Sequence, residues 1–230
     1  MSLIQSPHYM RDMVNEFDWL AHLKASPLGQ DQLRCALSSL STQDMVAVPC
    51  LEKGVCRMLV RLVDALPFRP ARPVTGSSTS PVFQDFQLCY DVPVTHALWG
   101  LAESLGRLFR AALSSDSLVE APTAFRFNDL IVQRYTAGCR GISPHRDHAR
   151  YVVVVAILVL SGDGEFCVCQ DRSGDAAVEI PARPGDLVLM RAPGLRGAGR
   201  RPFHLLRNVT RCRRTVGLRY DVEKGAGGLK

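Results

Sequence analysis

The chain has 230 residues, of which 47% are apolar and 22% are charged, and its formal net charge is +6. This length fits one sizeable domain or two small ones, and the composition is that of an ordinary globular protein. No apolar run approaches the roughly 20 residues that span a bilayer, and the first residues lack the pattern of a secretory signal. The eight cysteines form no CxxC pair, which argues against zinc-ribbon or dithiol redox chemistry. We therefore expect a cytoplasmic protein with reduced thiols that does not enter a membrane.

The first half of the chain is predicted to be mainly helical. Apolar residues recur at helical spacing through residues 1 to about 65, and the clearest apolar stripe covers residues 95–113. Between these segments, residues 67–81 are rich in Pro, Gly, Ser and Thr. Such a composition predicts a loop, which would be either a lid over a site or a plain surface linker.

After residue 122 the sequence changes to short strands separated by turns. Strands are predicted at residues 130–135, 152–160, 166–170, 187–190 and 213–222. Alternation in the first of them places Gln133 and Tyr135 on the same face. A series of this kind predicts a barrel or jelly roll. The expected organisation is therefore α+β, with a mainly helical region over 1–121, a β core over 122–222 and a flexible tail over 223–230.

A candidate metal site lies just after the first of these strands. His145 and Asp147 are two residues apart, so in extended backbone they project from one face. One imidazole and one carboxylate suit ferrous iron, whose common non-haem site adds a second histidine. Three of the other histidines lie in the helical half, and His148 would face away from Asp147. His204 is therefore the expected third ligand.

The last predicted strand carries the second half of the site. Arg213, Thr215, Gly217 and Arg219 alternate along it and share one face. Two guanidinium groups would flank a hydroxyl and a glycine, with room between them. Since arginine pairs bidentately with carboxylates, this face predicts a site for a small dicarboxylate.

The order of these motifs resembles that of the iron(II)/2-oxoglutarate-dependent oxygenases: HxD, a distal histidine, then Arg-x-Ser/Thr on the last core strand. The stretch from Phe127 to Tyr135 reads Phe-Asn-Asp-Leu-Ile-Val-Gln-Arg-Tyr. Together with Gly138 and the two arginines six residues apart, it resembles the AlkB-like branch of that superfamily. The similarity covers about residues 125–222.

The resemblance implies a double-stranded β-helix with the three metal ligands named above holding Fe(II), and with 2-oxoglutarate and O2 as cosubstrates. Arg213 would bind the distal carboxylate of 2-oxoglutarate with Thr215 beside it, and Arg219 would lie near its metal-chelating end. Tyr135 and Gln133 would face the cosubstrate from the neighbouring strand. Gln133 departs from the AlkB-like pattern, which usually has Asn at this position.

The implied reaction oxidises a C–H bond of an organic substrate and yields succinate and CO2. A specialised small molecule is favoured as that substrate, because the basic last quarter has few aromatic residues for stacking bases. The alternative is oxidative demethylation of alkylated nucleic acid, as in AlkB-type enzymes. Two further alternatives are a non-catalytic jelly-roll binding module and a cupin-type enzyme that uses another metal. The sequence does not predict an oligomeric state.

Overall fold

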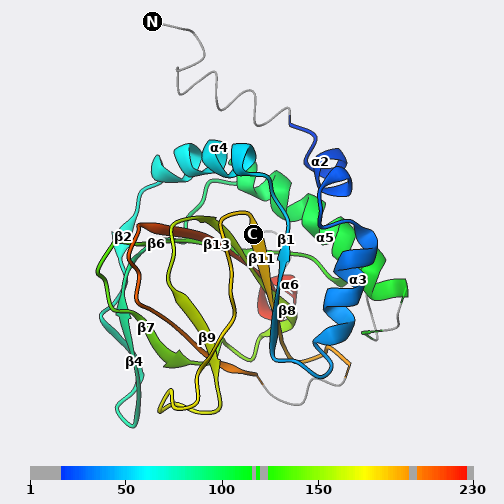
Figure 1. Cartoon of the computed structure of the whole chain (residues 1–230). Helices are drawn as coiled ribbons and strands as arrows, with labels where there is room; N and C mark the ends of the chain where they lie inside the picture. Colours follow the sequence, from blue (N-terminus) through cyan, green and yellow to red (C-terminus); the bar gives the residue numbers. More distant parts are fainter. Residues whose placement is uncertain (1–16, 116–117, 120–123, 197–200, 227–230) are drawn as a thin grey trace, which may run out of the picture.

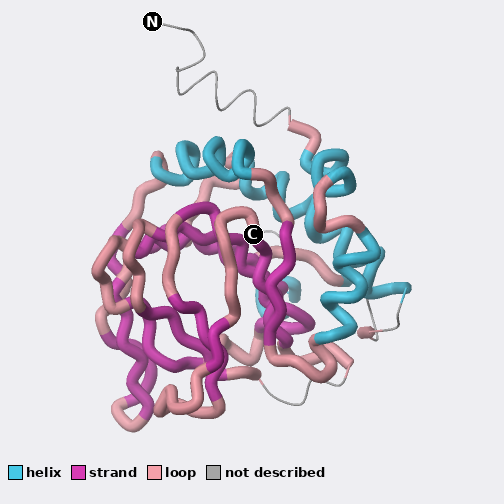
Figure 2. The backbone as a smooth tube through the Cα atoms, viewed as in Figure 1, coloured by secondary structure: helices cyan, strands magenta, loops and turns pink. Residues whose placement is uncertain are grey.

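The computed structural model describes residues 17–115, 118–119, 124–196 and 201–226, and two antiparallel sheets form its centre (Figures 1 and 2). The larger sheet contains, in order, β1 (Met45–Pro49), β11 (Asp186–Arg191), β8 (Tyr151–Ser161), β13 (Arg213–Asp221), β6 (Asp129–Tyr135), β5 (Gln87–Cys89) and β2 (Arg69–Pro70). The smaller sheet contains β10 (Val178–Glu179), β9 (Glu165–Cys169), β12 (Phe203–Arg207), β7 (Gly141–His145), β4 (Ser80–Asp85) and β3 (Val74–Ser77). These two sheets form a double-stranded β-helix within an α+β fold, as the resemblance implied.

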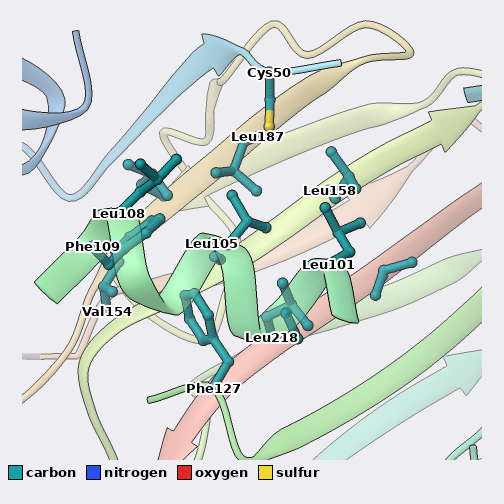
Figure 3. Close-up of a cluster of buried hydrophobic side chains, with 14 of the residues drawn as sticks. Cys50, Leu101, Leu105, Leu108, Phe109, Phe127, Val154, Leu158, Leu187 and Leu218 are labelled. Carbon is teal, nitrogen blue, oxygen red and sulfur yellow. The ribbon is translucent and has the colours of Figure 1, made fainter. Parts of the chain in front are cut away.

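Helices cover the larger sheet on the side away from the smaller one (Figure 1). They are α3 (Gln30–Ser39), α4 (Lys53–Asp64) and α5 (Ala97–Ser115), with α2 (Trp19–Ala25) packed against α5. Figure 3 shows Leu101, Leu105 and Phe109 of α5 beside apolar residues of β8, β11 and β13. Each such side chain, once fully buried, contributes about 1.5–3 kcal/mol through removal of apolar surface from water. The apolar stripe predicted over residues 95–113 is thus the face that attaches α5 to the sheet.

Strand β8 separates two hydrophobic layers. Val154 and Leu158 belong to the core under the helices, whereas Val155 and Val159 belong to the core between the sheets. Because both faces of the strand are buried, its sequence is a continuous β-branched and aliphatic run rather than an alternating one. The prediction of a fully buried strand here is confirmed.

The first half of the chain contains more strand than the sequence predicted. Residues 45–49, expected in the helical part, form β1 and pair with β11. Residues 67–81 are not a loop: β3 and β4 form a hairpin in which Val74 faces Phe83 and Gly76 faces Pro81. The side chains of Val74 and Phe83 are 52% and 58% exposed, so this hairpin lacks the alternation that marks a half-buried strand. The region predicted to be mainly helical, 1–121, and the predicted β core, 122–222, therefore both contribute strands to each of the two sheets.

Two smaller differences concern the last quarter of the chain. Strand β12, which carries His204, was not predicted, because the sequence placed His204 only between a loop and the last strand. Residues expected in a flexible tail form a short helix, α6 (Val222–Ala226), while 227–230 lie outside the described residues. The first 16 residues, where the helical prediction began, are also outside them. No helix in the described part of the chain is long and apolar enough to cross a membrane.

Candidate metal and cosubstrate site

His145, Asp147 and His204 come together in the structure, although 57 residues separate the last two. Strands β7 and β12 pair so that His145 lies directly opposite His204, with ring centroids 4.2 Å apart. Asp147 follows β7, and its Oδ1 lies 3.9 Å from Nε2 of His145 and 3.8 Å from Nε2 of His204. All three potential ligand atoms lie within 4.8 Å of one another. The three predicted ligands therefore form one cluster, which we call the triad.

Local backbone features aim both imidazoles at this cluster. Between His204 and Leu206 the register with β7 shifts by one residue, so β7 carries an extra residue next to Pro144. A bulge of this kind re-aims a side chain, and proline is tolerated there because no ladder hydrogen bond is required. Nδ1 of His145 lies 2.9 Å from the carbonyl oxygen of Ser143, and Nδ1 of His204 lies 3.4 Å from that of Pro202. A carbonyl only accepts, so each Nδ1 donates and each Nε2 keeps its lone pair for a metal.

Burial and charge keep the triad in the protonation states that metal binding needs. Burial lowers the pKa of His145, and burial together with the nearby His145 lowers the pKa of His204 to about 3. Burial alone would raise the pKa of Asp147, but Arg219 and the two imidazoles outweigh it and hold that pKa at about 2. The triad thus offers two neutral nitrogens and one carboxylate at neutral pH.

A row of polar side chains crosses the larger sheet opposite the triad. Strands β13 and β6 pair so that Arg213 faces Tyr135, Thr215 faces Gln133 and Arg219 faces Asp129. Thr215 Oγ1 lies 3.4 Å from Oε1 of Gln133. Burial raises the pKa of Tyr135 above its ordinary value, so the phenol remains a hydrogen-bond donor.

Arg213 is the least satisfied group in this row. Its side chain is 2% exposed, and its Nε and Nη1 have no hydrogen-bond partner among the described residues. Burial lowers the pKa of this guanidinium, although arginine stays charged in proteins. An uncompensated buried charge costs several kcal/mol. Arg213 is therefore suited to an anion from outside the chain.

Arg219 connects the triad to a second buried carboxylate. Its Nε donates to Oδ2 of Asp147 at 3.2 Å, and its Nη1 lies 3.6 Å from Oδ2 of Asp129. Asp129 is 2% exposed and also pairs with Lys224 of α6. Gly217 leaves room for this arrangement, because a Cβ there would lie 2.9 Å from Cγ2 of Ile131 and 3.3 Å from Nη1 of Arg219. The sequence predicted Arg219 near the metal but not what holds it in place.

Two cavities meet at the triad. The inner one is lined by the triad together with Tyr135, Gln133, Arg213, Thr215 and Arg219, so it collects every residue that the sequence assigned to the cosubstrate. The outer one, which we call the mouth, is open and has a volume of about 660 Å³. Both are lined by His145, Asp147 and Arg219, so the inner cavity opens into the mouth beside the triad.

The sequence did not predict several residues of the site. Asp129 lies on the same face of β6 as Gln133 and Tyr135, so the alternation along this strand could have indicated that it belongs to the site. Arg201 donates to the backbone carbonyl of Asp147, and Tyr151 lies under Arg219 with 5.1 Å between guanidinium and ring centre. Neither contact leaves a pattern in the sequence, because each joins positions far apart in the chain.

The donor set and the unpaired guanidinium together test which groups could bind here. Two histidines and one carboxylate on one side of an ion, with open positions opposite, are the ligands of non-haem iron(II). The buried fork of Arg213 matches a carboxylate in a bidentate manner. The residues present therefore fit a ferrous ion and a dicarboxylate bound between the triad and Arg213.

No protein-family model and no curated protein match this sequence. Solved structures with a similar fold include a Trichoplax adhaerens prolyl hydroxylase in complex with a hypoxia inducible factor peptide fragment, at 14% identity and a TM-score of 0.58. That match covers 85% of this chain and 91% of the other. A Pseudomonas putida prolyl-4-hydroxylase matches at 17% identity and a TM-score of 0.58, over 83% of this chain and 99% of the other. A 2OG-Fe(II) oxygenase family protein from Burkholderia pseudomallei matches at 17% identity and a TM-score of 0.55, over 84% of this chain and 91% of the other.

The chain has the fold of these oxygenases. At such low identity the likeness concerns the double-stranded β-helix and does not extend to the substrate.

Proposed function

We propose that the protein is an iron(II)/2-oxoglutarate-dependent dioxygenase that oxidises a C–H bond of an organic substrate. The observation that carries this proposal is the orphaned guanidinium of Arg213, which lines the same cavity as a two-histidine, one-carboxylate cluster. The triad alone would suit several metals, and Arg213 alone would suit many anions. Their joint presence in one cavity favours a metal ion with a dicarboxylate cosubstrate.

When bound, iron(II) and 2-oxoglutarate supply the activation of oxygen, with succinate and CO2 as coproducts. The residues of the chain position these groups and exclude water. His145, Asp147 and His204 would hold the metal, and Arg213 and Thr215 the distal carboxylate. Tyr135, directly opposite Arg213 on β6, also lines the inner cavity. Arg219 orients the carboxylate of Asp147 through its Nε. The Ile157 and Phe166 side chains complete the apolar wall of the inner cavity.

The test is conversion of 2-oxoglutarate to succinate with iron(II) and ascorbate and without a primary substrate. We expect slow succinate formation by the unchanged protein and none by His145→Ala or Arg213→Ala. Arg214→Ala is the matched control, because Arg214 neighbours Arg213 but pairs with Asp64 at 2.7 Å outside the cavity. If the unchanged protein forms no succinate and the metal-loaded protein binds no 2-oxoglutarate by calorimetry, the function is a different one.

The substrate part of the proposal is a specialised small molecule. The alternative is an alkylated nucleic acid, which the AlkB-like pattern from Phe127 to Tyr135 favours. Succinate formation above the uncoupled rate, measured with methylated oligonucleotides and with pools of small metabolites, distinguishes the two. Stimulation by oligonucleotides alone would replace the small-molecule assignment.

A further inference from the structure

The mouth above the triad is lined by arginines that lack carboxylate partners. Arg69, Arg72, Arg146 and Arg172 line it, and none lies within ion-pair distance of a carboxylate among the described residues. Asp147 is the sole carboxylate lining the mouth in that part of the chain, and Arg219 already neutralises it. The opening is therefore strongly positive.

Arginines elsewhere on the surface provide a contrast. Arg207 pairs with Glu165 and Arg211 pairs with Asp163, both at 2.9 Å. Arg150 lies 3.1 Å from Asp221. Other exposed arginines, such as Arg57 and Arg61 of α4, have no carboxylate partner among the described residues, so a missing partner alone does not mark a site. The mouth differs because four exposed guanidinium groups without such a partner surround one opening, whose lining carboxylate, Asp147, is already paired with Arg219.

Two of these cations share a single aromatic ring. The guanidinium carbons of Arg146 and Arg172 lie 4.0 Å and 5.6 Å from the ring centre of Phe203. Arg172 is further held by contacts of 3.5 Å and 3.4 Å to the carbonyl oxygens of Ser80 and Pro81 in the β3–β4 hairpin. Two cations held on one ring repel each other, and an anion that contacts them offsets this repulsion. The ring fixes the direction of both groups, so less side-chain entropy is lost when an anion binds.

The size and the neutral lining of the mouth indicate what kind of anion fits. A volume of about 660 Å³ lies within the range of small-molecule sites. Thr75, Ser77, Ser80 and Gln84 supply hydroxyl and amide groups on the hairpin side. Nucleic acid is disfavoured, because proteins hold single strands by stacking bases on aromatic rings. Among the rings that line the mouth, Phe86 and Tyr151 are buried and Phe203 is covered by Arg146 and Arg172. Tyr90, which is 42% exposed, is left as a single stacking surface.

We propose that the primary substrate is a small organic molecule carrying at least one phosphate or carboxylate group, which Arg69, Arg72, Arg146 and Arg172 bind at the mouth. This inference rests on the proposed function, since the mouth is a substrate site only if the triad holds the reacting metal. Phosphate and carboxylate each offer a pair of oxygens that can accept two parallel hydrogen bonds from a guanidinium group. The bound oxyanion would place the remainder of the molecule over His145 and Asp147.

The experiment is a calorimetric titration of phenyl phosphate, benzoate and phenol into protein saturated with manganese(II) and 2-oxoglutarate. Saturation with 2-oxoglutarate blocks Arg213, so the added anion reports on the mouth alone. We expect at least one of the two anions to bind about tenfold or more tightly than phenol, and added salt to weaken its binding. The stronger of the two anions identifies the substrate group as phosphate or carboxylate.

Variants assign the binding to the arginines. Arg69→Ala and Arg172→Ala should each raise the dissociation constant of the preferred anion about threefold to tenfold, and the double variant should raise it further. Arg57→Ala is the matched control, because Arg57 is an exposed arginine of α4 on the helical side of the molecule. Unchanged binding of 2-oxoglutarate in every variant shows that the fold and the inner cavity are intact.

Three results would overturn the inference while 2-oxoglutarate still binds. Phenol could bind as tightly as the anions, the arginine variants could leave anion binding unchanged, or a single-stranded hexanucleotide could bind more tightly than both anions with a steep salt dependence. The last result would assign the mouth to nucleic acid. If 2-oxoglutarate itself fails to bind, the proposed function fails instead, so the two failures are distinguishable.

Discussion

Arg213 combines a buried position with a charge that no described residue neutralises. In the protein without cosubstrate this group opposes folding, because its desolvation is not repaid by a partner. We expect Arg213→Met, which keeps an apolar side chain of comparable length, to leave the midpoint of thermal unfolding unchanged or raise it. The same change should weaken 2-oxoglutarate binding at least about a hundredfold. Thermal unfolding with and without 2-oxoglutarate measures both effects, and a large loss of stability in the unliganded variant would contradict this account of Arg213.

Asp129 is a positioning residue for the triad, since it holds Arg219, which in turn holds Asp147. We expect Asp129→Asn to lower metal affinity about tenfold, as is usual for groups that orient metal ligands. A metal titration followed by calorimetry measures this affinity. Asp221→Asn is the matched control, because Asp221 is equally buried and pairs with Arg150, away from the triad. Comparable losses of metal affinity in both variants would mean that Asp129 acts on stability alone.

At the level of single residues, the sequence predicted the side chains whose roles are encoded over short distances. His145 and Asp147 share a face because they are two residues apart, and Arg213, Thr215 and Arg219 share one for the same reason. Lys224 and Arg201 could not be found in this way. Lys224 reaches Asp129 across 95 residues, and Arg201 reaches the carbonyl of Asp147 across 54. Such contacts depend on how distant segments are placed in the folded chain, and no local sequence pattern indicates that placement.

At the level of secondary-structure elements, the site requires that β7 pair with β12, and this pairing depends on Gly141. This residue has φ of +77°, and a Cβ would lie 2.0 Å from the carbonyl oxygen of Leu206. We expect Gly141→Ala to destabilise the fold by several kcal/mol and to weaken metal binding, because the paired strands carry His145 and His204. Chemical denaturation and metal titration measure the two effects.

Gly138 provides the control for that prediction. It has φ of +80°, nearly that of Gly141, but a Cβ there would meet nothing within 4 Å. Gly138→Ala should therefore cost only about 1 kcal/mol, the usual strain of alanine in this conformation. Equal losses in the two variants would show that backbone strain, and not the close approach of β12, makes glycine necessary.

The elements that the sequence missed share a physical cause. The β3–β4 hairpin has no apolar buried face, because its half-buried positions include Ser80 and Gln84 while Phe83 is exposed. No alternation of apolar and polar residues therefore marks its strands. Strand β12 is only five residues long, and its Leu205 and Leu206 are both buried, one in each of two clusters. The core strands β6, β8 and β13 were predicted because burial on one or both faces leaves a clear pattern.

Across the whole molecule, the helical layer and the site lie on opposite sides of the larger sheet. Leu105 of α5 is fully buried under the helices, whereas Leu206 is nearly as buried but lines the inner cavity. We expect alanine at either position to cost about 2–5 kcal/mol of unfolding free energy. Only Leu206→Ala should also change the affinity for 2-oxoglutarate. Denaturation and calorimetry on both variants measure this, and an equal change of affinity in Leu105→Ala would show that the two layers are coupled.

His145 and His204 belong to the smaller sheet and Asp147 follows its strand β7, whereas Arg213 and Arg219 belong to the larger sheet. The ion pair of Arg219 with Asp147 joins the two sheets inside the inner cavity. A metal ion with a dicarboxylate bound to Arg213 would add a second connection between the sheets, one that is lost when these ligands dissociate. Ligands that bind only the folded state raise its stability by mass action. The lifetime of this protein in a cell would then rise and fall with the supply of metal and cosubstrate, so its abundance would report on that supply even where no substrate is present.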